Sequence, residues 1–181
     1  MGFLIGFLVN LLTFPGIIVH ELGHQLFCRL LRVPVLKVCY FRLGNPAGYV
    51  IHEPPQSPWA NLLIAIGPLF VNTTVGLLIA FPAVLGAFKF DTGDGIDFFL
   101  IWLGLSIAMH AFPSIGDARS IWKTVTSHQN SVFVKVVAIP LILLIYLGAA
   151  GSFFWLDAIY GICVVLFVPN AFVHFLASLG A

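Results

Sequence analysis

Long stretches without charge constrain this chain more than any other feature of its sequence. Met1 to Val19 contains no charged side chain, and over the whole sequence 60% of the residues are hydrophobic and only 8% are charged. Average soluble domains carry about 25% charged residues. Apolar runs of this length cross lipid bilayers as helices, so the sequence predicts an integral membrane protein in contact with a lipid bilayer. The net charge of +1 argues against nucleic acid as a partner.

The order of apolar and polar stretches predicts the fold class. We expect an all-α polytopic membrane protein with about five transmembrane helices and a small cytoplasmic β-hairpin between the first and second spans. At 181 residues the chain is the size of one domain, so we expect a single membrane-embedded domain, 1–181. Its expected parts are a metal-helix region 1–32, a hairpin connection 33–58, and spans 59–88, 98–112, 136–155 and 159–176.

The first apolar segment, residues 2–31, is too long for one upright span. Thirty helical residues cover about 45 Å, whereas the hydrocarbon core is roughly 30 Å thick. Two arrangements are consistent with this length. Either one helix is tilted, or Pro15 breaks it and Thr13 caps a second helix.

The connection that follows favours a β-hairpin. Val33 to Phe41 is rich in β-branched and aromatic residues, and Ala47 to His52 reads as a returning strand after a turn. The exposed edge between Val35 and Phe41 could pair with an extended peptide by strand addition. A connecting hairpin that binds nothing fits the sequence equally well.

Cations predict the orientation in the membrane. Positive charge is concentrated in the cytoplasmic loops of membrane proteins. Seven of the eight Lys and Arg residues fall in the first and third connections: Arg29, Arg32, Lys37, Arg42, Arg119, Lys123 and Lys135. We therefore expect a multi-pass protein with its N-terminus outside and its C-terminus and active-site end cytoplasmic.

The motif His20-Glu21-Leu22-Gly23-His24 is the strongest functional signal. Residues four apart lie on one face of a helix, so His20 and His24 can bind one metal ion. Glu21 is then placed to take a proton from a metal-activated water. Ionisable groups in a membrane segment are costly and are usually functional. The alternative is that both histidines are interior polar groups satisfied by neighbouring helices.

A catalytic zinc site has three protein ligands, so a third ligand is expected elsewhere. After His24 the chain crosses the membrane and returns, so residues that end the third span reach the depth of His24. Asp117 lies there and is the expected third ligand of one Zn²⁺ per chain. The same reasoning places Asp157 on the opposite side of the membrane. Asp117 could also be the N-cap of a helix that starts at Ala118, or fill both roles.

Two further polar residues could contribute to catalysis. His110 precedes Asp117 by two helical turns, so if the helix continues the two share a face. His110 could donate a hydrogen bond to an oxyanion, replace Asp117 as a ligand, or be a satisfied interior histidine. Asn72, in the second span, could be an oxyanion donor or form an interhelical hydrogen bond. The other histidines, His52, His128 and His174, have no companion motif.

These blocks together resemble the site-2 protease family of intramembrane zinc metalloproteases. The similar blocks are His20 to His24, Gly67 to Asn72, Pro113 to Asp117 and the basic stretch Arg29 to Val38. The resemblance implies an enzyme that hydrolyses peptide bonds in or near transmembrane segments of membrane proteins. The catalytic residues would be Glu21 with His110 and Asn72, and the metal ligands His20, His24 and Asp117.

The chain also departs from the family pattern. The family has Asn where this chain has His110, and Gly where it has Ala118, and the spacing to Asp117 is shorter by about one residue. These departures support an alternative function, a non-proteolytic metal-binding membrane scaffold or partner subunit that has kept the ligands. The substrate expected from the resemblance is a transmembrane protein or peptide. The sequence carries no indication of the oligomeric state.

Overall fold

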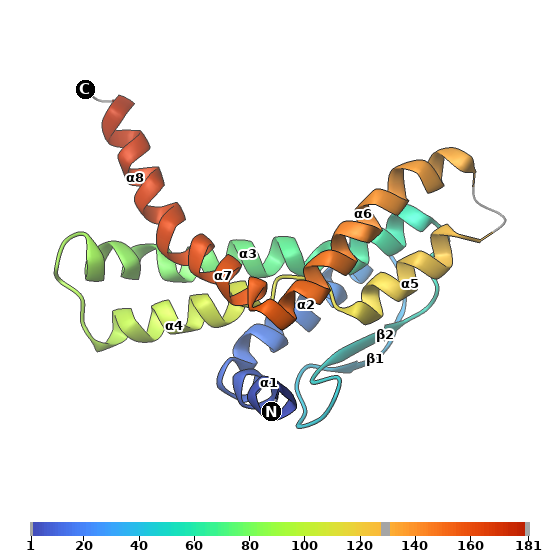
Figure 1. Ribbon diagram of the computed structural model, residues 1–181, viewed down its shortest axis with the longest axis horizontal. Coiled ribbons are helices and arrows are strands. Elements are labelled where there is room, and N and C mark those ends of the chain that lie inside the picture. The colour runs from blue at the N-terminus through green and yellow to red at the C-terminus, as the bar shows by residue number, and fades with distance from the viewer. Residues whose placement is uncertain (1, 128–130, 180–181) are drawn as a thin grey trace.

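The computed structural model describes residues 2–127 and 131–179, which are mostly helical (Figure 1). The elements in chain order are α1 (Gly2–Leu12), α2 (Phe14–Leu30), β1 (Val35–Cys39), β2 (Tyr49–His52), α3 (Pro58–Phe88), α4 (Gly95–Met109), α5 (Ile115–Val125), α6 (Val132–Gly151), α7 (Leu156–Ile162) and α8 (Val168–Leu179). A 3-10 turn, Ser152–Phe154, joins α6 to α7, and a π-helical segment, Cys163–Phe167, joins α7 to α8.

Three helical stretches in the described chain are long and apolar enough to cross a membrane: α3, α6 and Leu156–Leu179. A fourth exists if α1 and α2 count as one broken span. The structure thus has fewer candidate spans than the five expected. The difference is α4, because its 15 residues cover only about 22 Å of a core roughly 30 Å thick. The expected helical class and the small hairpin are confirmed.

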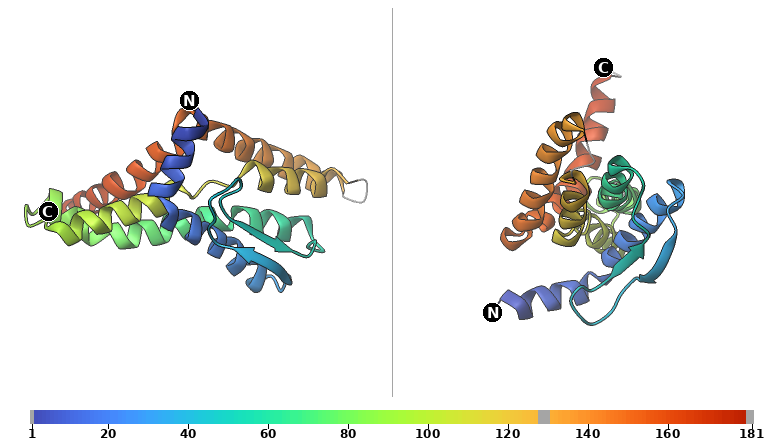
Figure 2. Two further views of the ribbon diagram at one scale, coloured as in Figure 1. Left: turned by 90° about the horizontal axis from the view of Figure 1, so that it is seen from below. Right: turned by 90° about the vertical axis from the view of Figure 1, so that its right-hand side faces the viewer.

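The N-terminal segment adopts the broken arrangement. The helix is interrupted at Thr13, and the axes of α1 and α2 differ by 80°. Pro15 lies in the first turn of α2, where a missing backbone N–H costs nothing. The Thr13 hydroxyl does not cap α2 as expected but donates a hydrogen bond to the Val9 carbonyl at 2.7 Å. As a result α1 projects away from the other helices (Figure 2).

The hairpin forms where it was expected, with shorter strands. β1 and β2 pair antiparallel, with Val38 opposite Val50 and a bulge between Val35 and Lys37. Both strands contact α2, which supports a two-stranded sheet that would be marginal alone.

α3 is the element around which the other helices pack. Its N-terminal half forms an apolar cluster with α5 and α6 that includes Leu62, Ile121 and Ile142. Its C-terminal half forms a second cluster with α4 and the Cys163–Phe167 segment, built from residues such as Val84 and Val165. Figure 1 shows these two halves side by side along α3. The turn between α4 and α5 lies between them.

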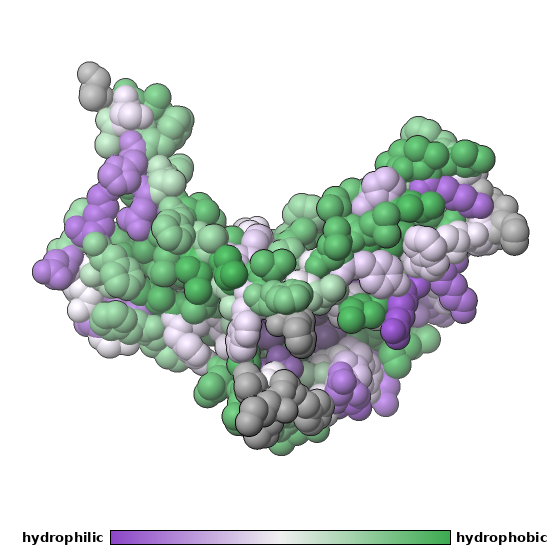
Figure 3. Space-filling view, viewed as in Figure 1, coloured by the Kyte–Doolittle hydropathy of each residue, from purple (hydrophilic) through white to green (hydrophobic). Residues whose placement is uncertain are grey.

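The outer surface agrees with a membrane environment. Figure 3 shows hydrophobic residues over most of α6 and around the base of α8, with hydrophilic residues towards the two ends of the molecule and around the hollow below its middle. Large exposed apolar side chains on α6 include Phe133, Leu144 and Leu147. Such extensive apolar exposure is the pattern of a lipid-facing surface, because soluble monomers rarely expose large contiguous apolar patches.

Candidate metal centre

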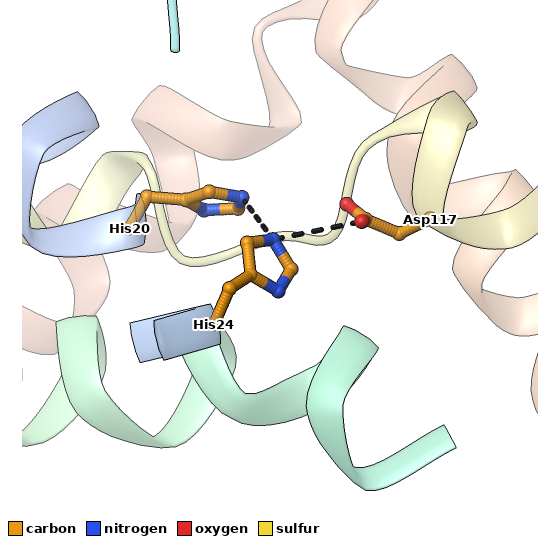
Figure 4. A group of neighbouring side chains, drawn as sticks. All are labelled: His20, His24 and Asp117. Atoms are coloured by element: carbon orange, nitrogen blue, oxygen red, sulfur yellow. Dashed lines mark hydrogen bonds and ion pairs between the residues drawn. The ribbon is translucent and has the colours of Figure 1, made fainter. Parts of the chain in front are cut away.

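His20, His24 and Asp117 converge at the junction of the two halves (Figure 4). The His20 and His24 Nε2 atoms are 3.1 Å apart, and His24 Nε2 is 3.5 Å from Asp117 Oδ1. One ligand atom from each residue lies within 4.8 Å of the others. Ligands about 2.0–2.1 Å from a tetrahedral ion lie roughly 3.3 Å apart. The His20–His24 and His24–Asp117 distances are close to this spacing, and the three side chains form a group that could hold a metal ion.

Both imidazole rings are oriented by backbone carbonyl groups. His20 Nδ1 lies 2.7 Å from the His110 carbonyl oxygen, and His24 Nδ1 lies 2.9 Å from that of Ile64. Because a carbonyl only accepts, each Nδ1 must carry the hydrogen. In the neutral rings both Nε2 atoms then present lone pairs to each other at 3.1 Å. That arrangement is repulsive unless a proton on one ring or a metal ion lies between the two nitrogens, so the donor set is compatible with a metal ion.

Asp117 is held by the start of its own helix. Ser114 is the N-cap of α5, and Asp117 completes a capping box as the third helical residue. Its Oδ2 accepts hydrogen bonds from the Ser114 amide at 2.7 Å and hydroxyl at 2.6 Å. The expected N-cap role before Ala118 is therefore wrong, because α5 starts at Ile115. The carboxylate supports the helix terminus and still directs Oδ1 towards His24.

The surroundings of Asp117 keep it ionised. Burial alone would raise the pKa of its carboxyl group, but the adjacent His24 imidazole and the Ser114 hydroxyl hold the pKa below its usual value. Asp117 thus presents a carboxylate to the two imidazoles, which is the form that binds a metal.

Glu21 is buried beside the histidines and against the hairpin. Only 6% of its surface is exposed. A Cβ atom added to Gly48 would come within 2.7 Å of the Glu21 carboxylate, so the absence of a side chain at Gly48 makes room for it. Glu21, His20, His24 and Asp117 line one cavity of about 760 Å³. A substrate group in this cavity could reach both the ligand cluster and the free carboxylate.

The cavity also includes a residue that the topology argument placed elsewhere. Asp157, expected on the opposite side of the membrane, lines the same cavity together with Ser152. The reason is that α6 ends at Gly151 and the following turn, with Trp155 in the left-handed conformation, lies over the site. No pattern in the sequence predicts this, because an apolar stretch of this length is expected to cross the whole bilayer and to place the following turn on the far side.

His110 lies beside the centre, but its ring points elsewhere. α4 ends at Met109, so His110 and Asp117 do not share a helix face as a continuous helix would require. The His110 Nε2 atom is 2.8 Å from the Thr13 hydroxyl, which is already donating to Val9. The backbone carbonyl of His110, not its ring, contacts His20. An oxyanion role for the ring stays a prediction.

Asn72 is fully buried and forms interhelical hydrogen bonds. Its Nδ2 atom donates to the carbonyl oxygens of Gly16 and Ile107 at 3.0 Å and of His110 at 3.3 Å. Its role as an oxyanion donor stays a prediction. Its contacts are interhelical hydrogen bonds, which is the second role that the sequence analysis considered for Asn72.

Some residues at the site were missed by sequence reasoning. Ser114 had a detectable signal, because Ser followed three residues later by an acidic residue resembles a capping box. Asn61 was detectable as a polar residue in an apolar span, and its amide bonds α5. The Ile64 carbonyl had no sequence signal at all.

Two of the histidines without a companion motif are His52 and His128. His52 forms a hydrogen bond with the carbonyl of the next residue, and His128 lies outside the described residues.

Comparisons with known proteins give no independent assignment. No family model, curated protein or solved structure matches this chain. The functional conclusion therefore depends on the geometry of His20, Glu21, His24 and Asp117.

Proposed function

We propose that this chain is an intramembrane zinc metalloprotease, similar to the site-2 proteases, that hydrolyses peptide bonds in or near transmembrane segments of membrane proteins. The observation that carries the proposal is the convergence of two imidazoles and a carboxylate, with Glu21 buried in the same cavity. A histidine pair at this helical spacing with an adjacent glutamate is the ligand and base set of zinc hydrolases.

The chemistry divides among four side chains. His20, His24 and Asp117 would hold one Zn²⁺, which supplies a Lewis acid and lowers the pKa of water towards neutrality. Glu21 takes a proton from the attacking water as the new C–O bond forms. It then delivers that proton to the amide nitrogen as the C–N bond breaks, so the products are a carboxylic acid and an amine. The Nδ1 bonds to His110 and Ile64 keep both imidazoles oriented throughout.

A helical substrate must unwind before it can be cleaved, because its carbonyl groups are hydrogen-bonded within the helix. The sequence pointed to the edge of β1 as the place to hold the unwound segment. The cavity instead borders β2, through Tyr49, Val50 and His52. We therefore place the extended substrate beside β2, where added-strand hydrogen bonds would bring its backbone to Glu21.

The orientation of the site follows from the distribution of cations. Arg119 lines the cavity near Asp117, and Arg29 and Arg42 belong to the other basic connection. By the positive-inside rule, the side of the molecule that carries these cations faces the cytoplasm, and water enters the cavity from that side.

The test is the substitution Glu21→Gln in purified full-length protein. We expect the variant to retain the metal content of the wild type, because Glu21 is not among the three ligands, and to lose cleavage of a single-span model substrate. Glu53→Gln is the matched control, because Glu53 is an exposed carboxylate outside the cavity lining. Its activity should equal that of the wild type.

The outcomes separate the proposed enzyme from the scaffold alternative. Turnover by Glu21→Gln at the wild-type rate would remove Glu21 from the mechanism. Wild-type protein that binds metal at the three ligands but cleaves none of a panel of single-span substrates would favour the non-proteolytic scaffold. That alternative is supported by the departures from the family pattern around His110 and Ala118.

A further inference from the structure

We propose that α3 is the template of the metal centre, with Asn72 as the positioning residue for His20 and Asn61 as the positioning residue for Asp117. This inference rests on the metal-binding part of the proposed function and not on proteolysis. α3 contributes no ligand itself, yet its groups contact both helices that do, α2 and α5, and the turn after α4 whose carbonyl orients the His20 ring. Asn61 and Asn72 are eleven residues apart, so they lie within about 20° of the same helix face.

The first contact acts through the His110 carbonyl. This oxygen lies 2.7 Å from His20 Nδ1 and 3.3 Å from Asn72 Nδ2. A carbonyl has two lone pairs, so it can accept from the imidazole and the amide together. Asn72 also donates to the Gly16 carbonyl, one turn before His20 on α2. One amide therefore fixes both the backbone that carries His20 and the carbonyl that orients its ring.

The acceptor half of the same amide is unused. Asn72 Oδ1 is buried without a hydrogen-bond partner, although such a group costs stability. The three carbonyl contacts require the Nδ2 atom, so an amide is needed at this position for its donors alone. A residue that served only to fill space between helices would be apolar. This favours a role in holding the two carbonyl groups beside His20.

The second contact is direct, through the backbone of α3. The Ile64 carbonyl accepts the hydrogen of His24 Nδ1 at 2.9 Å. The His24 ring is buried, so this bond is shielded from competing water.

The third contact reaches the helix that carries Asp117. Asn61 Nδ2 donates to the Thr124 hydroxyl at 2.8 Å and to the Ser120 hydroxyl at 3.4 Å. Ser120 and Thr124 lie about one and two turns after Asp117 on α5. Asn61 is itself buried and lines the cavity. It thereby sets how close α5 lies to α3, and so the distance from Asp117 to His24.

The test is a set of double-mutant cycles on metal affinity in the full chain. Zn²⁺ or Co²⁺ dissociation constants are measured in detergent by competition with a chromophoric chelator. Asn72→Ala should weaken binding about tenfold, the lower end of the effect of outer partners of metal ligands. This loss should disappear in a His20→Ala background and persist in an Asp117→Ala background. The loss caused by Asn61→Ala should show the reverse pattern.

The control is Thr73→Val, which follows Asn72 on α3. It removes an interhelical hydrogen bond of 2.6 Å to the Tyr160 hydroxyl while nearly preserving side-chain shape. It should change thermal stability without changing metal affinity. The visible spectrum of bound Co²⁺ gives a second measure, because altered ligand geometry in Asn72→Ala shifts its bands whereas Thr73→Val leaves them in place. If Asn72→Ala does not fold, Asn72→Ser, which keeps a shorter donor, replaces it.

Two results would overturn the template proposal. One is that Asn72→Ala weakens metal binding equally in the His20→Ala and Asp117→Ala backgrounds, and the other is that a folded Asn72 variant binds metal with wild-type affinity. Failure of the proposed proteolytic function would give a different set of results. In that case the wild type binds metal and the coupling pattern holds, but no substrate is cleaved. If the wild type binds no ion, both proposals are wrong.

Discussion

The two sides of the candidate metal centre are built differently. On the histidine side, α2 lies buried against α3 and α4, and each imidazole is bonded to a carbonyl from another segment. On the aspartate side, the Asp117 side chain is 22% exposed, and its carboxylate is bonded to Ser114 of its own helix terminus. Two of the candidate ligands thus have their rings oriented by other segments of the chain, whereas the carboxylate of the third is bonded within its own helix terminus. The comparison implies a preformed histidine pair that the carboxylate completes.

The ligand substitutions should show the largest difference. His24→Ala should weaken metal binding by more than about a hundredfold, which is the upper end of the loss for outer partners alone. Asp117→Ala should weaken it less, because both oriented imidazoles remain. Isothermal titration with Zn²⁺ measures both affinities, with Asp91→Ala in the exposed α3–α4 loop as the control. A greater loss for Asp117→Ala than for His24→Ala would reverse the proposed order of the two sides.

Substitution of two glycines tests whether the two sides are packed with different tightness. A Cβ on Gly16 would overlap the Ser106 carbonyl oxygen and the His110 ring, so Gly16→Ala should destabilise the fold by about 1–3 kcal/mol. A Cβ on Gly116 meets only the Ser114 hydroxyl, at 3.3 Å. Gly116→Ala should therefore be near neutral or stabilise α5 by up to about 1 kcal/mol. Denaturation in detergent measures the free energy of unfolding of both variants. Similar destabilisation by both would mean that the sides are packed alike.

Ser114→Ala should destabilise the fold less than Gly16→Ala does. The substitution removes the N-cap of α5 and one hydrogen bond to Asp117, so it should cost about 1 kcal/mol of stability. Metal affinity should fall by a few-fold, since the backbone amide of Ser114 still bonds Oδ2. Amide hydrogen exchange should increase in α5 and remain unchanged in α2. Increased exchange in α2 would show that the two sides are coupled more tightly than their contacts indicate.

The parts of the site that the sequence predicted depend on local geometry. The spacing of His20 and His24 is enough to place them on one helix face, because every α-helix has the same period. β-branched residues around Val35 indicated the hairpin for a similar reason. Local geometry was not enough to predict the position of Asp117. Its place beside His24 was predicted by counting how often the chain crosses the membrane. The structure brings these three residues together even though it has fewer candidate spans than expected.

The parts that the sequence did not predict depend on packing between distant segments. Where α4 ends decides whether the His110 ring faces the site, and the sequence indicated only that Pro113 would interrupt a helix somewhere nearby. The place of Asp157 depends on the turn after α6. Asn72 could be recognised as a polar residue in an apolar span, but its three acceptors belong to α2, α4 and the turn after α4. No local pattern encodes such contacts.

The most direct test of the central claim is X-ray absorption at the zinc edge of purified, zinc-loaded protein. We predict one zinc per chain with two imidazole nitrogens at about 2.0–2.1 Å and carboxylate or water oxygens at about 2.0–2.2 Å. Asp117→Ala should retain both imidazoles. A spectrum with sulfur ligands at about 2.3 Å, or one without imidazole scattering, would contradict the assignment of the ion to His20, His24 and Asp117.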